Sequence, residues 1–279
     1  MITPDAARAA FAALPRLARD AAYVVAYSGG IDSTVLLHIA HHGLGLTPLR
    51  VVHVNHGLQA QSAEWALHCR RQCELLGLDC ETVNVTVDHD SGLGLEAAAR
   101  NARYAALSAV MQAGDMLLTA HHADDQAETF LLQAMRGGGV RGLAAMPMIR
   151  PLAQGSHARP LLNFSRSDIR AYAEKYELSW IDDPSNADET FSRNYLRHKV
   201  MPLLTDGWQH VSQRLSLTAE RCAETISLLD EIAQNDLKAC QHADSAQTLN
   251  VQVYVSMSMP RRHNLITHWA CLLYTSPSP

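Results

Sequence analysis

Strand-like and helical segments alternate through the first half of the 279-residue chain, and this order limits the folds open to it. Short apolar runs at 23–27, 49–54, 81–87 and 116–120 have the length of buried strands. Between them, apolar residues recur at helical spacing near 33–42, 62–76 and 96–112, and a fourth helical stretch begins near Asp124. The alternation predicts an α/β fold with a parallel sheet and helices on both faces.

Polar stretches follow three of these strands. They are SGGIDS at 28–33, HVNHGL at 53–58 and AHHADDQAET at 120–129. In parallel α/β sheets, ligands bind beyond the carboxyl ends of the strands. We therefore expect the functional site at this edge of the sheet.

The first polar stretch predicts an anion site. Gly29 and Gly30 expose backbone N–H groups at a helix N-terminus, and Ser28 and Ser33 add hydroxyl donors. The stretch lacks the Lys of a GxxxxGK[ST] loop and is not GxGxxG. A bare Asp32 carboxylate would repel phosphate there unless Mg²⁺ bridges the two. The alternative is an ordinary turn between strand and helix.

Asp125 and Glu128 form a second candidate site. They lie three residues apart at the start of a helix, so both carboxylates share one face. Such a pair can hold a metal ion or the ammonium group of an amine substrate. The alternative is a solvated helix N-terminus whose acids suit the helix dipole. The position directly after a parallel strand favours a functional role.

Basic residues give weaker signals. Glu96 and Arg100 form either an i,i+4 ion pair or, with Arg103, a contact to phosphate or substrate. The stretch SRNYLRHK at 192–199 is either a solvated helix face or a contact to a phosphate backbone. The net charge of −5 and the pI of about 6.3 argue, on their own, against a nucleic-acid partner.

Composition excludes several other classes of protein. The six cysteines contain no CxxC pair, which argues against a disulfide framework, a zinc site or an iron–sulfur cluster. No stretch approaches the roughly 18 apolar residues of a membrane span. Charged residues interrupt the apolar N-terminus, which predicts an amphipathic helix and not a signal peptide. We expect a cytoplasmic protein without a membrane partner.

The second half has a different organisation. The glycine-rich stretch at 137–142 predicts a loop, and residues 159–178 predict a short extended piece followed by a helix. Ser165 and Asp168 predict a capping box for that helix. A basic helix should end at Pro202, and an amphipathic helix should run from about Val211 to Cys240.

The last residues change character abruptly. We expect a chain truncated near Trp269 with a non-native tail; a native disordered tail is the alternative. The expected domains are an α/β domain at 1–204, then a helical connector and the start of a second domain at 205–271. The tail would occupy 272–279.

Through SGGIDS the chain resembles the N-type ATP pyrophosphatase superfamily, and it is similar in more detail to the tRNA(Ile)-lysidine synthase family. The stretch DPSN at 183–186, followed by RNYLRHKVMPLL at 193–204, is specific to that family. Similar stretches cover about 23–204. They are YSGGIDSTVLLH, VVHVNHGLQ, GLEAAARNARY, TAHHADDQAETFLLQAMRGGGVRGLAAM, RPLLNFSRSDIRAYA and WIDDPSNADETFSRNYLRHKVMPLL.

This resemblance implies a Rossmann-like catalytic domain of PP-loop type that uses ATP and Mg²⁺. The implied reaction ligates free lysine to C2 of the wobble cytidine of a minor isoleucine tRNA with a CAU anticodon. ATP adenylates the base and releases pyrophosphate, and the lysine amine then displaces AMP. A homodimer is among the expected partners.

The resemblance also implies roles for individual residues. Ser28, Gly29, Gly30, Ile31 and Ser33 would hold the phosphates, and Asp32 would hold Mg²⁺. Asp125 and Glu128 would bind lysine or position its amine, with Asp125 also near the metal. Arg193 would face the lysine carboxylate or the adenylate phosphate. His53 and Asn55 would lie near the adenosine, and Arg136 and Gly138 close to the nucleotide.

The chain departs from the family pattern in two places. Gln59 stands where the family commonly has Arg, which puts one contact in doubt. The C-terminal region that grips tRNA in longer members is incomplete, so the resemblance implies a catalytic domain at 1–204 followed by a helical connector and an incomplete C-terminal tRNA-binding domain at 205–271. Other classes stay open as alternatives: a tRNA thiolating enzyme, a GMP synthase or NAD synthetase half, or a non-catalytic adenine-nucleotide-binding module. The first would be expected to carry paired cysteines, and the next two a glutaminase domain.

Overall fold

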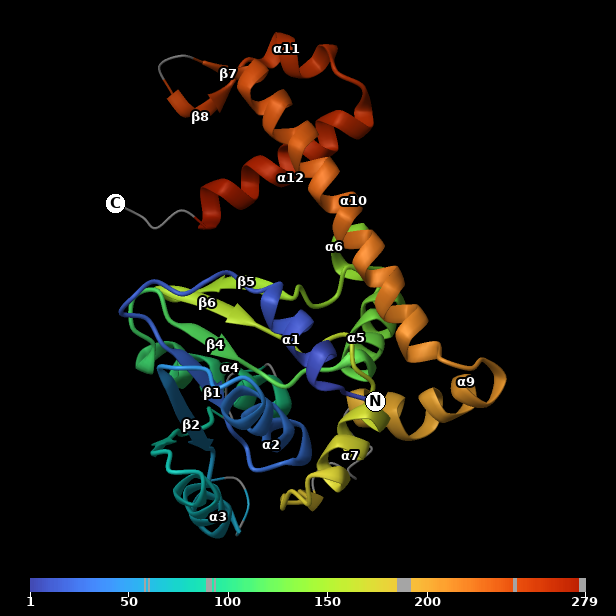
Figure 1. Cartoon of the computed structure of the whole chain (residues 1–279). Helices are drawn as coiled ribbons and strands as arrows, with labels where there is room; N and C mark the ends of the chain where they lie inside the picture. Colours follow the sequence, from blue (N-terminus) through green and yellow to red (C-terminus); the bar gives the residue numbers. More distant parts are fainter. Residues whose placement is uncertain are drawn as a thin grey trace. The chain divides into compact units, whose positions relative to one another are not determined.

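The computed structural model describes residues 1–57, 59, 61–88, 92, 94–184, 192–242 and 245–275. The chain divides into two compact units (Figure 1). The first comprises Met1–Leu132 and Ala145–Ser216, and the second comprises Gln133–Ala144 and Leu217–Pro279. Ser185 and Asn186 of the DPSN stretch, and residues 276–279 of the expected tail, lie outside the described residues.

The first unit is built on a mostly parallel sheet, as the sequence predicts. Its six strands, among the described residues, have the order β3-β2-β1-β4-β6-β5. The strands are β1 (Tyr23–Ala26), β2 (Leu49–Asn55), β3 (Cys80–Asn84), β4 (Met116–Leu118), β5 (Ile149–Leu152) and β6 (Gly155–Ala158). Only the pairing of β5 with β6 is antiparallel. On one side of β1 lie β2 and β3, and on the other side lie β4, β6 and β5. The strand order therefore reverses at β1, and a topological switch point lies between β1 and β4.

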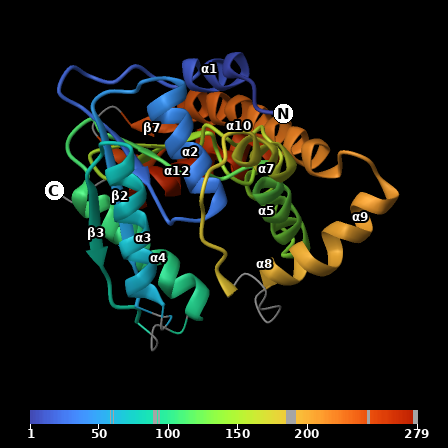
Figure 2. The same cartoon turned by 60° about the horizontal axis from the view of Figure 1, so that its bottom comes forward.

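Helices cover both faces of this sheet, which confirms the predicted layers. Successive strand residues point to opposite faces. Val25 and Leu118 therefore pack on one side, with residues of α1 (Pro4–Ala12), α2 (Ile31–His38), α3 (Ser62–Leu75) and α7 (Arg166–Lys175). Val24 and Leu117 pack on the other side, against Leu107 of α4 (Leu95–Val110). Figure 2 shows α3 and α4 beside β2.

The structure corrects the sequence around the last two strands. The strands β5 and β6 were not predicted, and the extended piece expected after 158 is a turn. The predicted capping box is confirmed. The Asp168 N–H donates to Ser165 Oγ at 3.1 Å, and the Ser165 N–H donates to Asp168 Oδ2 at 3.0 Å.

The prediction that Pro202 ends a basic helix is wrong. Helical backbone runs through α8 (Ser192–Tyr195), the π-helix η3 (Leu196–Val200) and α9 (Met201–Gly207). Pro202 lies in the first turn of α9. Proline is tolerated there, because the first turn of a helix leaves its N–H groups without intrahelical partners.

The second unit contains most of α10 (Val211–Cys240), whose ends match the predicted helix. The glycine-rich stretch is not wholly a loop, because α6 (Val140–Leu143) forms within it. The remaining elements are β7 (Gln241–His242), β8 (Ser245–Leu249), α11 (Val251–Ser256) and α12 (Met259–Thr275). Leu237, Cys240 and Leu265 form the core of this unit. Among the described residues, no helix is long and apolar enough to cross a membrane.

Candidate functional site

The glycine loop between β1 and α2 has a shape that only glycine permits at one position. Gly29 has φ +81°, in the left-handed region that L side chains rarely adopt. A Cβ on Gly29 would lie 2.9 Å from both Cys69 Sγ and Ile181 Cδ1. The Ile181 N–H also donates to the Gly29 carbonyl at 2.8 Å. Conformation and close packing therefore both require this glycine.

The loop hydroxyls are bonded to the loop itself. Ser33 Oγ donates to the Gly30 carbonyl at 3.0 Å and accepts from the Ser28 N–H at 3.2 Å. Ser28 Oγ lies 3.1 Å from Ser33 Oγ. Thr34 Oγ1 donates to the same Gly30 carbonyl at 3.0 Å. These bonds fix the loop at the N-terminus of α2, where Ile31 is the first helical residue.

A pocket of about 190 Å³ lies at the carboxyl ends of β1, β2 and β4. This is the switch point of the sheet, where ligands bind in α/β folds. Its lining combines apolar and polar side chains: Ala26, Tyr27, Ser28, Asp32, Ser33, Val54, Arg103, Tyr104, Leu107, Thr119, Ala120, His121 and Asp125. Pockets for drug-sized ligands measure roughly 300–1,000 Å³, so this pocket would enclose only part of a nucleotide.

Asp32 provides a carboxylate oxygen suited to a cation. Its Oδ1 is buried and accepts no hydrogen bond within the described part of the chain. The Nε2 atom of His122 lies 3.8 Å from this oxygen. Burial raises the pKa of the Asp32 carboxyl, because the charged form is poorly solvated. A buried carboxylate oxygen that lacks a donor fits Mg²⁺, which takes oxygen ligands.

The protein supplies few ligands for such an ion. No group of three or more His, Cys, Asp or Glu side chains is placed to hold a metal, as far as the described residues extend. Mg²⁺ usually binds to one or two carboxylates together with substrate phosphates and water. Asp32, with Asp125 nearby in the same pocket lining, matches that pattern.

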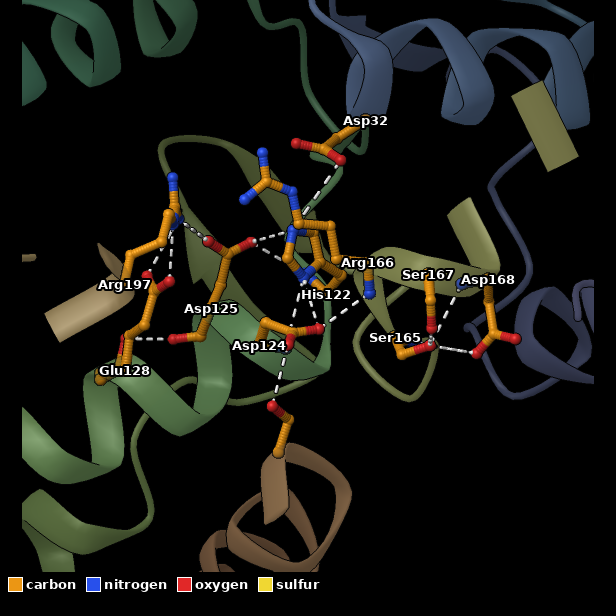
Figure 3. A network of polar contacts seen from close by, with 12 residues as sticks. Asp32, His122, Asp124, Asp125, Glu128, Ser165, Arg166, Ser167, Asp168 and Arg197 are labelled. Atoms are coloured by element: carbon orange, nitrogen blue, oxygen red, sulfur yellow. Dashed lines mark hydrogen bonds and ion pairs between the residues drawn. The ribbon is translucent and has the colours of Figure 1, made fainter. Parts of the chain in front are cut away.

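His122 lies among three carboxylates and was not singled out by the sequence analysis (Figure 3). Its Nε2 lies 3.5 Å from Asp125 Oδ2, and its Nδ1 lies 3.6 Å from Asp124 Oδ2. Burial alone would lower the pKa of His122, but the charges of Asp125, Asp124 and Asp32 outweigh it and raise the pKa to about 9. At neutral pH the ring is therefore an imidazolium.

Protonation of His122 changes its hydrogen bond with Asp124. Nδ1 of His122 lies 3.2 Å from the Asp124 N–H, from which the neutral ring accepts a hydrogen bond. The protonated ring donates towards Asp124 Oδ2 instead. In return, the hydrogen bond from His122 helps to lower the pKa of Asp124 to about 2, although burial raises it. Ser212 Oγ also donates to Asp124 Oδ1 at 2.8 Å.

Glu128 has two arginine partners. Arg193 Nε donates to Glu128 Oε2 at 2.8 Å, and Arg197 donates from Nε to Oε1 at 2.7 Å and from Nη2 to Oε2 at 3.0 Å. The Glu128 side chain is 2% exposed. Both of its oxygens are thus occupied. The sequence suggested a metal ion or a lysine ammonium for this carboxylate, and the structure shows arginine partners.

Asp125 connects the arginines to the histidine. Its Oδ1 lies 3.2 Å from Arg197 Nη2 and 3.5 Å from Arg193 Nη2, while its Oδ2 faces His122. These cations hold the pKa of Asp125 well below its usual range, although burial opposes them. Arg193, predicted to face a substrate, contacts Asp125 and Glu128. The sequence analysis expected Asp125, Glu128 and Arg193 at the site but did not predict the ion pairs between them.

The residues expected near adenosine have structural partners. His53 is buried, and its Nδ1 lies 2.9 Å from the Tyr27 carbonyl. Asn55 Nδ2 donates to Asn84 Oδ1 at 3.1 Å, which links β2 to β3. Neither residue lines the pocket; their neighbour Val54 does. The sequence analysis did not connect Tyr27 and Tyr104 with the site, although both line the pocket.

Arg136 and Gly138, which were expected close to the nucleotide, belong to the second unit. A Cβ on Gly138 would lie 2.8 Å from the Gln133 carbonyl oxygen, so the chain approaches itself closely after α5 (Ala123–Met135). Gln59, where the family commonly has Arg, accepts from Ser62 Oγ at 2.6 Å through its carbonyl, next to the start of α3.

Comparisons with known proteins agree with this geometry, in which a glycine loop that contains a carboxylate lies at a switch point. A family model described as the PP-loop domain matches residues 5–204. The chain belongs to the PP-loop family. In this PP-loop protein the match includes the glycine loop, Asp125, Glu128 and the two arginines.

Curated relatives of this PP-loop protein share one name, tRNA(Ile)-lysidine synthase. The relative from Alkalilimnicola ehrlichii is 50% identical over 259 residues, covering 92% of this chain and 58% of its own length. Those from Xanthomonas campestris pv. campestris and Pseudomonas syringae pv. tomato are 46% and 44% identical, covering 92% and 91% of this chain. The chain spans 58% to 59% of the length of these relatives.

A solved structure supports the fold. The U34-tRNA thiolase NcsA from Methanococcus maripaludis, with its [4Fe-4S] cluster, aligns with a TM-score of 0.63 at 18% identity. The alignment covers 79% of this chain and 78% of the thiolase. At this identity the similarity concerns the fold alone.

Proposed function

We propose that the chain carries the catalytic part of a ligase that joins free lysine to C2 of the wobble cytidine of isoleucine tRNA with a CAU anticodon. ATP adenylates the cytidine O2 and pyrophosphate leaves. The lysine ε-amine then attacks C2, loses a proton and displaces AMP. The 50% identity to a tRNA(Ile)-lysidine synthase across 92% of the chain is the observation that carries this proposal. We place the catalytic domain at 1–204.

The pocket at the switch point supports the use of ATP. Backbone N–H groups from the glycine loop and the N-terminus of α2 favour phosphate there. Asp32, with Asp125 beside it, would hold Mg²⁺, which when bound supplies positive charge to the phosphates. The positive charge on His122 keeps these carboxylates ionised and close together.

A second pocket supports the use of an amino acid. It measures about 550 Å³ and is lined by Asp124, Glu128, Arg166, Arg197, Met201, Pro202, Thr205 and Asp206. Lysine carries two ammonium groups and one carboxylate. Asp206 would attract an ammonium group, and Arg166 would attract the carboxylate. In this arrangement Glu128 is a positioning residue, because it holds Arg193 and Arg197 in place.

Exchange of labelled pyrophosphate into ATP tests the proposed function. An adenylating enzyme catalyses this exchange only when the base that accepts the adenylyl group is present. We therefore expect exchange with isoleucine tRNA transcript and none without it. A non-catalytic adenine-nucleotide-binding module would bind ATP and show no exchange with either. Exchange that is equally fast without tRNA would point to adenylation of a small molecule and would contradict the proposal.

A further inference from the structure

Polar contacts connect Arg150 and the buried Arg159 to the pocket at the switch point. Arg150 Nε donates to His157 Nδ1 at 3.2 Å, and Arg159 Nη2 lies 3.3 Å from the same nitrogen. On its other edge, His157 Nε2 lies 2.7 Å from Thr119 Oγ1. Thr119 Oγ1 in turn lies 2.8 Å from His121 Nδ1. Thr119 and His121 both line the pocket.

The arginines fix the direction of the first hydrogen bonds. A guanidinium group only donates, so His157 Nδ1 must be the acceptor and carry no proton. Burial, together with the charges of Arg159 and Arg150, lowers the pKa of His157 to about 2, so the ring is neutral. A neutral imidazole has one N–H group. In His157 that group is Nε2–H, which donates to Thr119 Oγ1.

The Thr119 hydroxyl group accepts one hydrogen bond and donates another, and this determines the tautomer of His121. Its oxygen accepts from His157, and its one proton needs an acceptor because the side chain is buried. Within the described residues, the other polar contact of Thr119 Oγ1 is with His121 Nδ1. Burial lowers the pKa of His121 to about 3, so this ring is also neutral. Since His121 Nδ1 accepts, its proton is on Nε2.

The charges around the pocket indicate what this N–H group would meet. The guanidinium carbons of Arg100, Arg103 and Arg150 lie 5.6, 5.8 and 5.3 Å from the centre of the Tyr104 ring. No carboxylate of the described residues forms an ion pair with Arg100 or Arg103. Arg103 lines the pocket together with His121. Asp32 and Asp125 also line this pocket, but Asp125 is paired with His122, Arg193 and Arg197. The charge of Arg103 therefore favours an anionic acceptor over a neutral one beside His121.

We propose that the chain of contacts from Arg150 and Arg159 through His157 and Thr119 fixes His121 as the Nε2–H tautomer, which donates a hydrogen bond to a phosphate oxygen of the bound nucleotide. This inference rests on the ATP binding of the proposed function. Thr119 and His157 are positioning residues, because they act through His121. A donor fixed in this way contributes to binding without a proton transfer.

Nuclear magnetic resonance of nitrogen-15-labelled histidine tests the tautomer. We expect the protonated nitrogen of His121 to be Nε2 in the wild-type chain. Thr119→Val keeps the shape of the side chain but removes the hydroxyl group, so His121 should become a mixture of tautomers. Thr119→Ser keeps the hydroxyl group and should retain the wild-type pattern. His157 should stay Nε2–H in both variants, because its arginine donors remain. Wild-type His121 protonated on Nδ1 would overturn the inference.

Calorimetric titration with ATP and with adenosine tests the acceptor. Thr119→Val should weaken ATP binding about twofold, because an equal mixture of tautomers leaves about half of the His121 rings able to donate to the phosphate. Adenosine, which has no phosphate, should bind both variants and the wild type equally. An equal loss for adenosine, or no loss for ATP, would overturn this inference alone. A wild-type chain that binds no ATP would overturn the proposed function as well.

Discussion

The guanidinium of Arg197 forms two hydrogen bonds with the carboxylate of Glu128, at 2.7 Å from Nε to Oε1 and 3.0 Å from Nη2 to Oε2. This bidentate geometry makes the pair strong and directional. The Arg197 side chain is 22% exposed and that of Glu128 only 2%. A single buried carboxylate therefore holds the π-helix η3 against α5.

Glu128→Gln should destabilise the protein. The amide removes one negative charge and leaves the Arg193 and Arg197 guanidinium groups without their buried partner. Breaking a buried ion pair from one side costs about 3–5 kcal/mol. Unfolding in urea, followed by circular dichroism, measures the loss.

Arg170 and Glu174 provide the matched control for this change. They form an exposed i,i+4 pair at 3.2 Å, with side chains 68% and 61% exposed. Glu174→Gln should cost no more than about 0.5 kcal/mol, because solvent screens the pair. Equal losses for the two variants would show that burial of Glu128 has no energetic role.

His122 should make stability depend on pH in the alkaline range. Its pKa is raised to about 9 in the folded protein, against about 6.5 in an unfolded chain. The stabilisation is therefore complete below pH 6.5 and is lost as the pH rises through 9. The shift corresponds to about 3 kcal/mol. Urea unfolding between pH 6 and pH 10 measures it, and His122→Gln should lack this component of the slope. A slope that persists unchanged in His122→Gln would assign it to other groups.

Asp32→Asn should separate Mg²⁺ binding from folding. Because Asp32 Oδ1 accepts no hydrogen bond from the described residues, the amide should change stability by less than about 1 kcal/mol. ATP affinity should lose its dependence on Mg²⁺. Asp5→Asn, an exposed acid in the first turn of α1, is the control and should leave that dependence unchanged. Wild-type Mg²⁺ dependence in Asp32→Asn would contradict the metal role.

Gly29→Ala should destabilise the loop through both its backbone and its packing. The positive φ of +81° costs about 1–2 kcal/mol with a side chain. The clash with Cys69 and Ile181 adds about 1–3 kcal/mol. Gly45, with φ +59° and nothing within 4 Å of its Cβ position, isolates the backbone part. Thermal unfolding of Gly29→Ala and Gly45→Ala compares the two, and equal losses would contradict the packing contribution.

Local patterns predicted most of the layered fold. The period of apolar residues distinguishes strands from helices in the first unit, because burial on one face imposes that period. The capping box at Ser165 depends on residues three positions apart and was equally predictable. The short strands β5 and β6 were missed, because strands of four residues containing Arg150, Pro151, Gly155 and His157 lack an apolar pattern.

The site was only partly predictable, because its contacts join distant segments. Arg197 lies 69 positions from Glu128, and His157 lies 38 positions from Thr119. Neither pairing leaves a local signal in the sequence. His122 is different, since Asp124 and Asp125 lie only two and three positions after it in AHHADDQAET. A histidine next to two carboxylates is a signal for a raised pKa that the sequence analysis could have used.

Lysine incorporation with product stoichiometry tests the proposed ligation most directly. The chain would be incubated with ATP, Mg²⁺, radiolabelled lysine and a transcript of isoleucine tRNA with the CAU anticodon. We expect one AMP and one pyrophosphate for each lysine joined to the tRNA. A transcript whose wobble cytidine is replaced by uridine should accept no lysine. Formation of ADP instead of AMP, or ATP consumption that leaves no lysine in the tRNA, would contradict the proposed function.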